Sequence, residues 1–336
     1  METALVTGAN GFIGSHLATS LVERGFMVYA IHRRKTSKNP TYNKYVEEGK
    51  IKVFIGDVSN FDTTVIPAVD YVYHIAGKVS VWGKLEDFRK INLGGTKNFL
   101  EYAKRNNVKC FTYLSSVAVY GFYGYKNITE DGVKKPFKNP YGLSKLETEN
   151  FVKDYCSQNN VPFVIIRPGN VYGEYDYTSS HEIYTRVKKE KMLISAGGKY
   201  ESCFVYAGNL VEAIIHTSQT LNARCTDYNV ADNNDTLKTY LTDVANTFGV
   251  RAKFKNFPAP IARLTACLVE GFYKLFFIKK APLITRFSVY QNCADYSFSI
   301  DKLLKTGYSP KFTKEQGIQN TVNWIKELDD ETKTNN

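Results

Sequence analysis

The chain has 336 residues, of which 43% are hydrophobic, 14% aromatic and 23% charged. This composition excludes a disordered chain and is sufficient for one large domain, or for a domain with a smaller lobe. Lys and Arg outnumber Asp and Glu by 44 to 33, a net charge of +11. The cations are scattered and no nucleic-acid-binding motif is present, so we expect no nucleic-acid partner.

Six cysteines lie far apart in the chain, without a CxxC pair. This spacing indicates a reducing compartment, no disulfide scaffold and no structural metal. We expect no secretory signal, because residues 3–7 already have the pattern of a strand. No run of about 18 uncharged apolar residues is present, which argues against a spanning helix. We therefore expect a cytoplasmic protein, with association at a membrane surface as an open alternative.

The first half of the chain alternates short apolar runs with helical periods. Strands rich in Val, Ile and Tyr are predicted over residues 3–7, 27–32, 51–55, 71–75, 110–115 and 163–167. Helices are predicted over residues 12–24, 61–66, 85–106 and 141–159. This alternation predicts the α/β class, with a Rossmann-type doubly wound parallel sheet that is covered by helices on both faces.

After Pro168 the alternation breaks. Helices are predicted over 180–191, 237–248 and 313–328, a strand over 228–231, and a stiff connector over 256–260. This pattern predicts a smaller C-terminal substrate lobe that is partly interleaved with the sheet. The predicted division is a cofactor-binding domain with the catalytic residues over 1–170, a substrate lobe over 171–328, and a frayed tail over 329–336.

The first predicted strand is followed by the sequence Gly8-Ala-Asn-Gly11-Phe-Ile-Gly14, which opens a helix. Gly8 permits a tight turn, Gly11 lets the backbone approach a pyrophosphate, and Gly14 lets the helix pack closely on the sheet. The start of the helix offers free N–H groups and a positive dipole to phosphates. Strand, glycine turn and helix together predict a dinucleotide site.

The GxxGxxG spacing resembles the extended branch of the short-chain dehydrogenase/reductase superfamily, which includes the NAD-dependent epimerases and dehydratases. Two further segments support the resemblance, one ending in Asp57-Val58 at the adenine position and one in Ala76-Gly77 at the ribose position. Asn92 begins a segment similar to the NxxGT helix motif of this branch. The resemblance implies cofactor contacts from Gly8, Gly11, Phe12, Ile13, Gly14, Asp57, Val58, Ala76, Gly77 and Asn92.

The end of the second predicted strand is basic. His32 stands where many NAD-using relatives carry Asp, and it is followed by Arg33-Arg34-Lys35. A carboxylate at this place would repel a 2′-phosphate, whereas a guanidinium binds it. Arg33 also matches the arginine of dihydroflavonol-reductase-like members that use NADP. We expect NADP (NADPH), with NAD less favoured; the alternative is a solvated basic loop that binds no ligand.

The catalytic residues are expected at the end of the fifth strand and the start of the following helix. Tyr141 and Lys145 are four residues apart and share a helix face. A nearby ammonium favours a phenolate and lowers its pKa from about 10, so Tyr141 is predicted to transfer the proton and Lys145 to tune it. Lys145 would also hydrogen-bond the nicotinamide ribose. Ser116 would orient the substrate oxygen, and Ser115 is placed beside the cofactor or against the sheet.

Glu149 completes a YxxSKxxxE pattern, and the sequence Arg167-Pro-Gly-Asn-Val-Tyr-Gly resembles the RPxxVYG segment of the same branch. The resemblance implies that Pro168, Gly169 and Val171 approach the nicotinamide carboxamide. Arg167 itself has two interpretations, a direct role at the site or a structural ion pair beneath it.

The substrate class has weaker signals. Dehydratases carry a Thr and an Asp-Glu pair where this chain has Ser116-Val-Ala, and nucleotide-sugar members usually carry an arginine where this chain has Ser202. Residues 204–210 and 281–286 are similar to the 3β-hydroxysteroid dehydrogenase/isomerase family. The resemblance implies an NADP-dependent oxidoreductase that interconverts a secondary alcohol and a ketone on an apolar, steroid-like or other ring-fused substrate. The alternatives are a nucleotide-sugar 4-epimerase, a flavonoid-type 4-keto reductase and a non-catalytic cofactor sensor.

The segment 261–278 is amphipathic. Its apolar stripe consists of Ile261, Leu264, Leu268, Leu275 and Phe276, and the opposite face carries Arg263, Glu270 and Lys274. We interpret it as a lobe helix that closes the substrate pocket. The alternative is peripheral membrane contact through 261–280, with Phe272, Phe276 and Phe277 in the bilayer and Lys279 and Lys280 at the headgroups. A homodimer is a further possible assembly.

Overall fold

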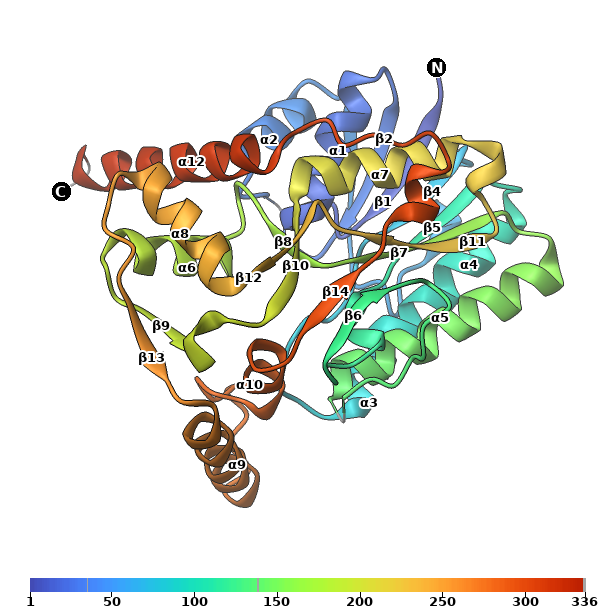
Figure 1. The fold of residues 1–336 in the computed structure, drawn as a ribbon. Coiled ribbons are helices and arrows are strands. Elements are labelled where there is room, and N and C mark those ends of the chain that lie inside the picture. The colour runs from blue at the N-terminus through green and yellow to red at the C-terminus, as the bar shows by residue number, and fades with distance from the viewer. Residues whose placement is uncertain (35, 138, 335–336) are drawn as a thin grey trace.

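The structure is a computed structural model that describes residues 1–34, 36–137 and 139–334 (Figure 1). Lys35 of the basic segment lies outside the described residues. A seven-stranded sheet forms the larger layer, in the order β11-β7-β5-β4-β1-β2-β3. Its strands are β1 (Thr3–Thr7), β2 (Met27–His32), β3 (Ile51–Ile55), β4 (Tyr71–His74), β5 (Cys110–Leu114), β7 (Phe163–Pro168) and β11 (Thr226–Val230). All neighbours pair in parallel, which confirms the predicted fold class.

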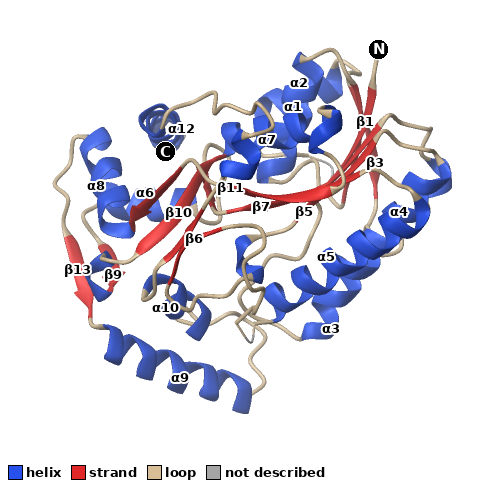
Figure 2. Cartoon of the chain, turned by 45° about the vertical axis from the view of Figure 1, so that its right-hand side comes forward, coloured by secondary structure: helices blue, strands red, loops and turns tan. Residues whose placement is uncertain are grey.

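Helices cover both faces of this sheet (Figure 2). One face carries α1 (Phe12–Glu23), α2 (Pro40–Glu47) and α7 (Ala207–Gln219), and the other carries α4 (Gly95–Arg105) and α5 (Pro140–Asn159). Along β1, Ala4 and Val6 are buried with the first group of helices, and Leu5 is buried with the second. Apolar side chains on both sides of a strand are therefore needed here, which is why these strands are almost continuously hydrophobic.

The predicted helix over 85–106 is one helical segment with an irregular centre. It consists of α3 (Leu85–Phe88), a π-helical turn (Arg89–Gly94) that contains Asn92, and α4. The prediction of a helix over 61–66 is wrong, because only a 3₁₀ turn forms (Thr63–Val65). Pro67 keeps the residue before it out of the helical region, so the segment cannot extend.

The smaller layer contains a five-stranded sheet built from distant parts of the chain. Its strands are β12 (Asn233–Thr236), β10 (Glu201–Tyr206), β14 (Tyr296–Phe298) and β6 (Tyr125–Ile128) in that order, with β8 (Asn170–Tyr172) paired to β10. Because β6 comes from the first half of the chain, the two halves are interleaved at this sheet. The remaining helices are α6 (Ser180–Lys188), α8 (Leu237–Phe248), α9 (Ala259–Leu275), α10 (Arg286–Asn292), α11 (Asp301–Leu304) and α12 (Lys314–Thr334).

Two predictions for the second half are corrected. The stiff connector expected over 256–260 is the end of a strand, β13 (Phe254–Phe257), and the start of α9. This strand pairs in parallel with β9 (Met192–Ser195). The tail expected to fray from residue 329 continues α12 to Thr334. An ion pair between Lys188 and Asp329 (2.5 Å) ties the end of α12 to α6, and residues 335–336 lie outside the described part.

A buried ion pair joins α5 to the large sheet. Arg167 on β7 is fully buried and donates to Glu149 on α5 through Nε (2.9 Å) and Nη2 (2.7 Å). Its guanidinium also pairs with Asp227 on β11 and donates to the Tyr120 hydroxyl at 2.8 Å. Because these partners occupy the guanidinium, Arg167 forms a structural ion pair beneath the site, which is one of the two interpretations given above.

Replacing Arg167 with Met should destabilise the fold strongly. The change leaves Glu149 buried without its cation and Asp227 with Lys153 (3.1 Å) as its remaining partner, and breaking a buried pair in this way typically costs about 3–5 kcal/mol. Urea unfolding would measure it. Arg89→Met is the matched control, since Arg89 makes an exposed bidentate ion pair with Glu147 on the same helix (2.8 and 2.6 Å), and exposed pairs contribute little. Equal losses for the two variants would contradict a special role for the buried pair.

Candidate active site

A cleft of about 1060 Å³ lies along the carboxyl ends of the strands of the large sheet. It spans the point between β1 and β4 where the strand order reverses, the usual ligand position in an open parallel sheet. The glycine turn and the end of β2 line one end of the cleft, and side chains from β10 and α10 line the other. Its size is at the upper end for single ligands, so it has room for an extended cofactor and a second molecule.

The glycine turn forms a tight approach between β1 and α1. Gly8 has a positive φ of +67°, and a Cβ on Gly14 would lie 2.2 Å from the Gly8 carbonyl oxygen. No side chain caps the start of α1 at Gly11. The first-turn N–H groups of α1 therefore have no side-chain acceptor, and Phe12 and Ile13 line the cleft. These groups fit a pyrophosphate, which needs N–H donors and a positive helix end.

The end of β2 presents cations to the cleft. His32 is buried and points into the protein, where its Nε2 lies 3.0 Å from the Tyr42 hydroxyl and its Nδ1 contacts the Arg34 carbonyl. Burial lowers the pKa of His32, so the ring is neutral at pH 7. The Arg33 side chain is 72% exposed, and its Nη1 lies 3.9 Å from Asp57. The position where an NAD site would have a carboxylate is thus held by the neutral His32, and the guanidinium of Arg33 follows directly after β2.

Asp57 follows β3 and lines the same corner with Val58. Its carboxylate accepts hydrogen bonds from the Ser59 backbone N–H (2.9 Å) and hydroxyl (2.7 Å). These two hydrogen bonds lower the pKa of Asp57, and Arg33 adds a smaller effect in the same direction. Asp57 is therefore an anionic acceptor at neutral pH.

Tyr141 and Lys145 are positioned by the start of α5. The Asn139 side chain caps this helix by accepting from the Tyr141 N–H (2.8 Å) and the Gly142 N–H (3.3 Å). Pro140 occupies the first helical position, where its missing N–H costs nothing. The cap places Tyr141 in the first turn and Lys145 one turn further, and both line the cleft.

Ser116 lies opposite Tyr141. Its hydroxyl accepts from the Ala118 N–H (3.1 Å) and so begins the short turn after β5. Burial raises the pKa of Tyr141, and a hydrogen bond with Ser116 acts in the opposite direction. Of the two serines, Ser116 is therefore the one that contacts the tyrosine.

The electrostatic expectation for Tyr141 is corrected. Lys145 was expected to lower the pKa of Tyr141, but burial raises that pKa instead. The reason is the direction of the lysine side chain: Nζ donates to the Leu114 carbonyl at 2.7 Å and lies 6.0 Å from the centre of the Tyr141 ring. Burial also lowers the pKa of Lys145 to about 8. In this arrangement Tyr141 keeps its proton at neutral pH.

Ser115 and Asn92 differ in their relation to the cleft. Ser115 lines it, and its buried hydroxyl has no hydrogen-bond partner among the described residues, as expected for a group that serves a ligand. Asn92 is buried behind the wall, where it accepts from the Lys78 N–H (2.7 Å) and donates to the Ser144 hydroxyl (2.9 Å). It braces the loop after β4 against α5. The expected direct contact from Asn92 to a cofactor is therefore not supported by its position.

The remaining predicted residues all line the cleft. Gly8, Gly11, Gly14, Ala76, Gly77, Pro168, Gly169 and Val171 form its walls. At Gly77 an added Cβ would lie 3.3 Å from both the Lys145 Nζ and the Asn92 Oδ1, so the backbone approaches the lysine closely. Their roles toward a cofactor stay predictions, but their common position fits a dinucleotide that extends from the glycine turn to Tyr141.

The far end of the cleft was missed by the sequence analysis. It is lined by Phe122, Phe204, Phe287, Gln291 and Asn170. Gln291 donates to the Asn170 side chain at 2.9 Å, so amide groups lie among the aromatic rings. These residues are far apart in the chain. Family-like segments contain Phe204 and Asn170 or precede α10, but nothing in their patterns placed these side chains together in the cleft.

The far end also lacks cations. Of the described residues that line the cleft, the cationic ones are Arg33, Arg34 and Lys38 near β2, and Lys145 beside Tyr141. Ser202, where nucleotide-sugar members carry an arginine, is buried in β10. A diphosphate at this end would have no guanidinium partner from the lining residues.

The amphipathic segment 261–278 does not close the cleft through its apolar stripe. Leu264 is 61% exposed and Leu268 is 65% exposed. The buried face is the opposite one, with Ala262 and Ala266 packed in a small apolar cluster with Val289 of α10. The cleft wall in this region comes from α10 instead. The interpretation of the stripe as a pocket cover is therefore wrong.

Replacing Lys145 with Met should raise stability at neutral pH. Lys145 has an ordinary pKa of 10.5 and a folded-state pKa of about 8, so the folded state resists its protonation. This cost is fully present below about pH 8, shrinks as pH rises, and is absent above the unfolded pKa. After the lost hydrogen bond to Leu114 is allowed for, we expect a gain of about 1–2 kcal/mol at pH 7.

Thermal unfolding of wild type and Lys145→Met at a series of pH values would measure this difference. The gain should disappear as the pH approaches 10. A variant that is less stable than wild type at pH 7 would show that the lysine is held by favourable contacts rather than against a burial cost.

Comparisons with known proteins agree with this geometry. Residues 4–231 match the profile of the NAD dependent epimerase/dehydratase family. An Escherichia coli O157:H7 protein, N-acetyl-alpha-D-glucosaminyl-diphospho-ditrans,octacis-undecaprenol 4-epimerase, is 26% identical over 96% of this chain and 95% of its own length. A Mycobacterium tuberculosis 3 beta-hydroxysteroid dehydrogenase/Delta 5-->4-isomerase is 26% identical over 98% of this chain and 92% of its own length.

Among solved structures, the UDP-glucuronic acid 4-epimerase from Bacillus cereus in complex with NAD has a similar fold. Its TM-score is 0.77 at 22% identity, over 97% of this chain and 99% of that chain. This likeness concerns the fold, whereas the family match covers more than half of the sequence. The chain therefore belongs to the NAD dependent epimerase/dehydratase family and is an NAD(P)-dependent enzyme of the epimerase/dehydratase type.

Proposed function

We propose that the chain transfers a hydride between a secondary alcohol carbon of its substrate and a nicotinamide cofactor, with Tyr141 exchanging the hydroxyl proton. One observation carries this proposal: Ser116, Tyr141 and Lys145 line the same cleft as the glycine turn. The orphan hydroxyl of Ser115 and the uncapped start of α1 fit a cofactor between them.

Bound NAD(P) would supply the hydride acceptor or donor. Ser116 and Tyr141 would hold the reacting oxygen by two hydrogen bonds. In the reducing direction, Tyr141 donates its proton to the forming alkoxide, which suits its raised pKa. In the oxidising direction Tyr141 would first release its own proton, which Lys145, with a pKa of about 8, could take up in its neutral form, and the resulting phenolate would then accept the alcohol proton.

We propose 4-epimerisation of a sugar on a diphosphate-linked carrier as the net reaction. Oxidation of the C4 hydroxyl gives a ketone, and return of the hydride to its other face gives the epimer. Support comes from the family and from the Escherichia coli epimerase, which is similar over 96% of this chain. The amides of Asn170 and Gln291 at the far end are suitable partners for sugar hydroxyl groups.

The second candidate is net oxidation of an apolar, ring-fused alcohol, the leading expectation from the sequence. The aromatic side chains of Phe122, Phe204 and Phe287 and the lack of cations at the far end favour it. The Mycobacterium tuberculosis relative has a comparable identity. The family relatives favour the epimerase, so we rank the steroid-type reaction second.

Cofactor stoichiometry separates the two reactions. Wild type would be incubated with UDP-hexoses, a polyprenyl-diphosphate-linked N-acetylhexosamine and 3β-hydroxysteroids, each with trace or excess cofactor. An epimerase converts many substrate molecules per cofactor without net reduction, because it returns each hydride. A dehydrogenase forms one reduced cofactor per product. Net reduction in step with product would contradict the epimerase.

Tyr141→Phe should lower turnover of the active substrate by roughly a hundredfold or more, because it removes the acid–base group. Cofactor affinity, measured by fluorescence, should change little. Tyr155→Phe is a matched control, since Tyr155 lies on the same helix but does not line the cleft. Full activity of Tyr141→Phe would remove this tyrosine from the mechanism.

We further propose that NADP is preferred over NAD. The support is the exposed Arg33 and the cleft-lining Arg34 at β2, together with the neutral, inward-facing His32. The structural relative in complex with NAD carries this cofactor in its own site, which leaves the preference of this chain to be measured.

Arg33→Asp should shift the preference towards NAD. The change removes a charged hydrogen bond to a 2′-phosphate, about 1.5–3 kcal/mol or roughly ten- to a hundredfold, and adds a repulsive carboxylate. The ratio of kcat/KM for the two cofactors measures it, with Arg24→Asp as a control on the far side of α1. An unchanged ratio would mean that Arg33 does not bind the phosphate.

A further inference from the structure

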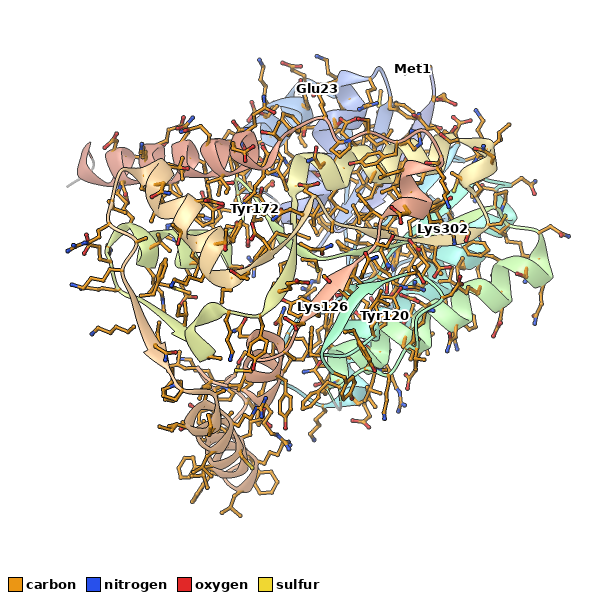
Figure 3. All side chains as sticks on the ribbon, in the orientation of Figure 1. Met1, Glu23, Tyr120, Lys126, Tyr172 and Lys302 are labelled. Carbon is orange, nitrogen blue, oxygen red and sulfur yellow. The ribbon has the colours of Figure 1, made fainter. Side chains whose placement is uncertain are left out.

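The helix α9 stands away from the body of the molecule, and its side chains project outward at the lower end (Figure 3). In the described part of the chain, eight of the eighteen exposed large hydrophobic side chains fall within residues 261–283. They are Ile261, Leu264, Leu268, Phe272, Leu275, Phe276, Phe277 and Leu283. We call this set the α9 stripe. Monomeric soluble proteins rarely expose so contiguous an apolar surface without a partner for it.

The opposite face of α9 fixes the helix in place. Ala262 and Ala266 are buried against α10. The Glu270 carboxylate accepts from the Arg286 backbone N–H (2.6 Å) and from its Nε (2.8 Å). The α9 stripe is therefore not the face through which the helix packs on the rest of the protein. It is the outward face of a helix whose packing is complete on the other side.

The charges around the α9 stripe have one sign. The exposed cations of this segment are Lys279 and Lys280, which follow α9, and Arg263 and Lys274, which lie on the other side of the helix from the stripe. There Arg263 lies over the Tyr290 ring (5.6 Å) and Lys274 over the Trp82 ring (6.0 Å). The acidic residue of the segment, Glu270, is buried and paired with Arg286. An outward apolar helix face, with cations beyond its end and on its polar side, complements the acyl boundary and the anionic headgroups of a bilayer. The same charges would repel a second copy of this surface.

We propose that α9 docks on an anionic lipid bilayer, with the α9 stripe in the acyl boundary and the exposed cations of the segment at the headgroups. No helix in the described residues is long and apolar enough to cross a membrane, so the contact is interfacial. At 17 residues, α9 has the length and amphipathic pattern of a helix that lies in the plane of the interface.

The docking surface continues into the cleft. Trp82 Nε1 donates to the Ile278 carbonyl at 3.1 Å, and its ring meets Tyr273 edge-on at 6.1 Å. Val79 and Val81, on the same loop, line the cleft. Phe287 and Gln291 do so from α10, which packs on α9. Docking would thus hold the far end of the cleft close to the bilayer surface.

This position has a consequence that rests on the proposed function. A substrate with an apolar anchor in the bilayer and its reacting alcohol at the surface could enter the far end of the cleft without leaving the membrane. The docking itself needs neither substrate nor cofactor, so it can be tested separately from catalysis.

Sedimentation of the full chain with vesicles tests the docking. We would compare phosphatidylcholine vesicles with and without phosphatidylglycerol, at about 0.1 M and about 1 M salt, where the screening length falls from about 10 Å to about 3 Å. Wild type should pellet with the anionic vesicles at low salt, and less with neutral vesicles or at high salt. Failure of wild type to pellet with anionic vesicles would overturn the proposal.

Two kinds of variant identify the surface. Leu268→Asp with Phe272→Asp should weaken binding at least about tenfold, and Lys279→Glu with Lys280→Glu should weaken binding to anionic vesicles only. Leu221→Asp is the control, because Leu221 is 78% exposed but lies after α7 at the other end of the molecule. Unchanged thermal unfolding would show that each variant is folded, as expected for exposed positions.

Light scattering completes the test. Wild type that forms dimers, which the Leu268→Asp and Phe272→Asp changes dissociate, without any vesicle binding, would assign the α9 stripe to a second copy and overturn the proposal. Equal vesicle binding by wild type and both variants would also overturn it, since the contact would then lie elsewhere. Loss of catalysis with vesicle binding intact would instead count against the proposed function alone.

Discussion

One face of α5 joins the chemistry of the cleft to the core beneath it. Tyr141, Lys145 and Glu149 are each one turn apart, so they lie on one line along the helix. Tyr141 faces the cleft, Lys145 reaches the Leu114 carbonyl of β5, and Glu149 holds the buried Arg167 of β7. The position of the phenol therefore depends on two buried polar contacts that bind α5 to two neighbouring strands. Burying a cation costs free energy. At Lys145 this cost appears as a pKa that burial lowers to about 8.

The two ends of the cleft are built in different ways. The cofactor end comes from short local units, each a strand end with the turn that follows it, such as Gly8–Gly14 after β1. The far end is assembled from β8, β10 and α10, which meet only because β6, β8, β10 and β14 share the smaller sheet. A local unit keeps its geometry when residues elsewhere in the chain change. At the far end, by contrast, a substitution in any one of the contributing segments changes the side chains that line the cleft. This division is suited to a family whose members are named for different substrates.

The same division explains what the sequence could predict. The bounds of β1, β2 and β3 were predicted as observed, because apolar strands buried on both faces have a strong local pattern. The glycine turn and the Tyr141–Lys145 pair are also local. The shift of the Tyr141 pKa was predicted in the wrong direction, because the Lys145 side chain donates to a backbone carbonyl of β5, which lies far from it in the sequence. Asn92 has the expected spacing, but a π-helical turn places it behind the wall. Hydrophobic periodicity showed that residues 261–278 have an apolar face. It did not show that a different face of the helix, with the small residues Ala262 and Ala266, is the one that packs on the protein.

Three features of this chain can have a common cause. Ser202 replaces an arginine, aromatic rings line the far end of the cleft, and the α9 stripe faces outward beside that end. A diphosphate bound within the far end of the cleft would need cations there, whereas a diphosphate held at the bilayer surface would need none within the cleft. On our proposals, the carrier stays in the bilayer while only the reacting part of the substrate enters. The cations that a membrane-bound substrate requires would then stand outside the cleft, where Lys274, Lys279 and Lys280 are found.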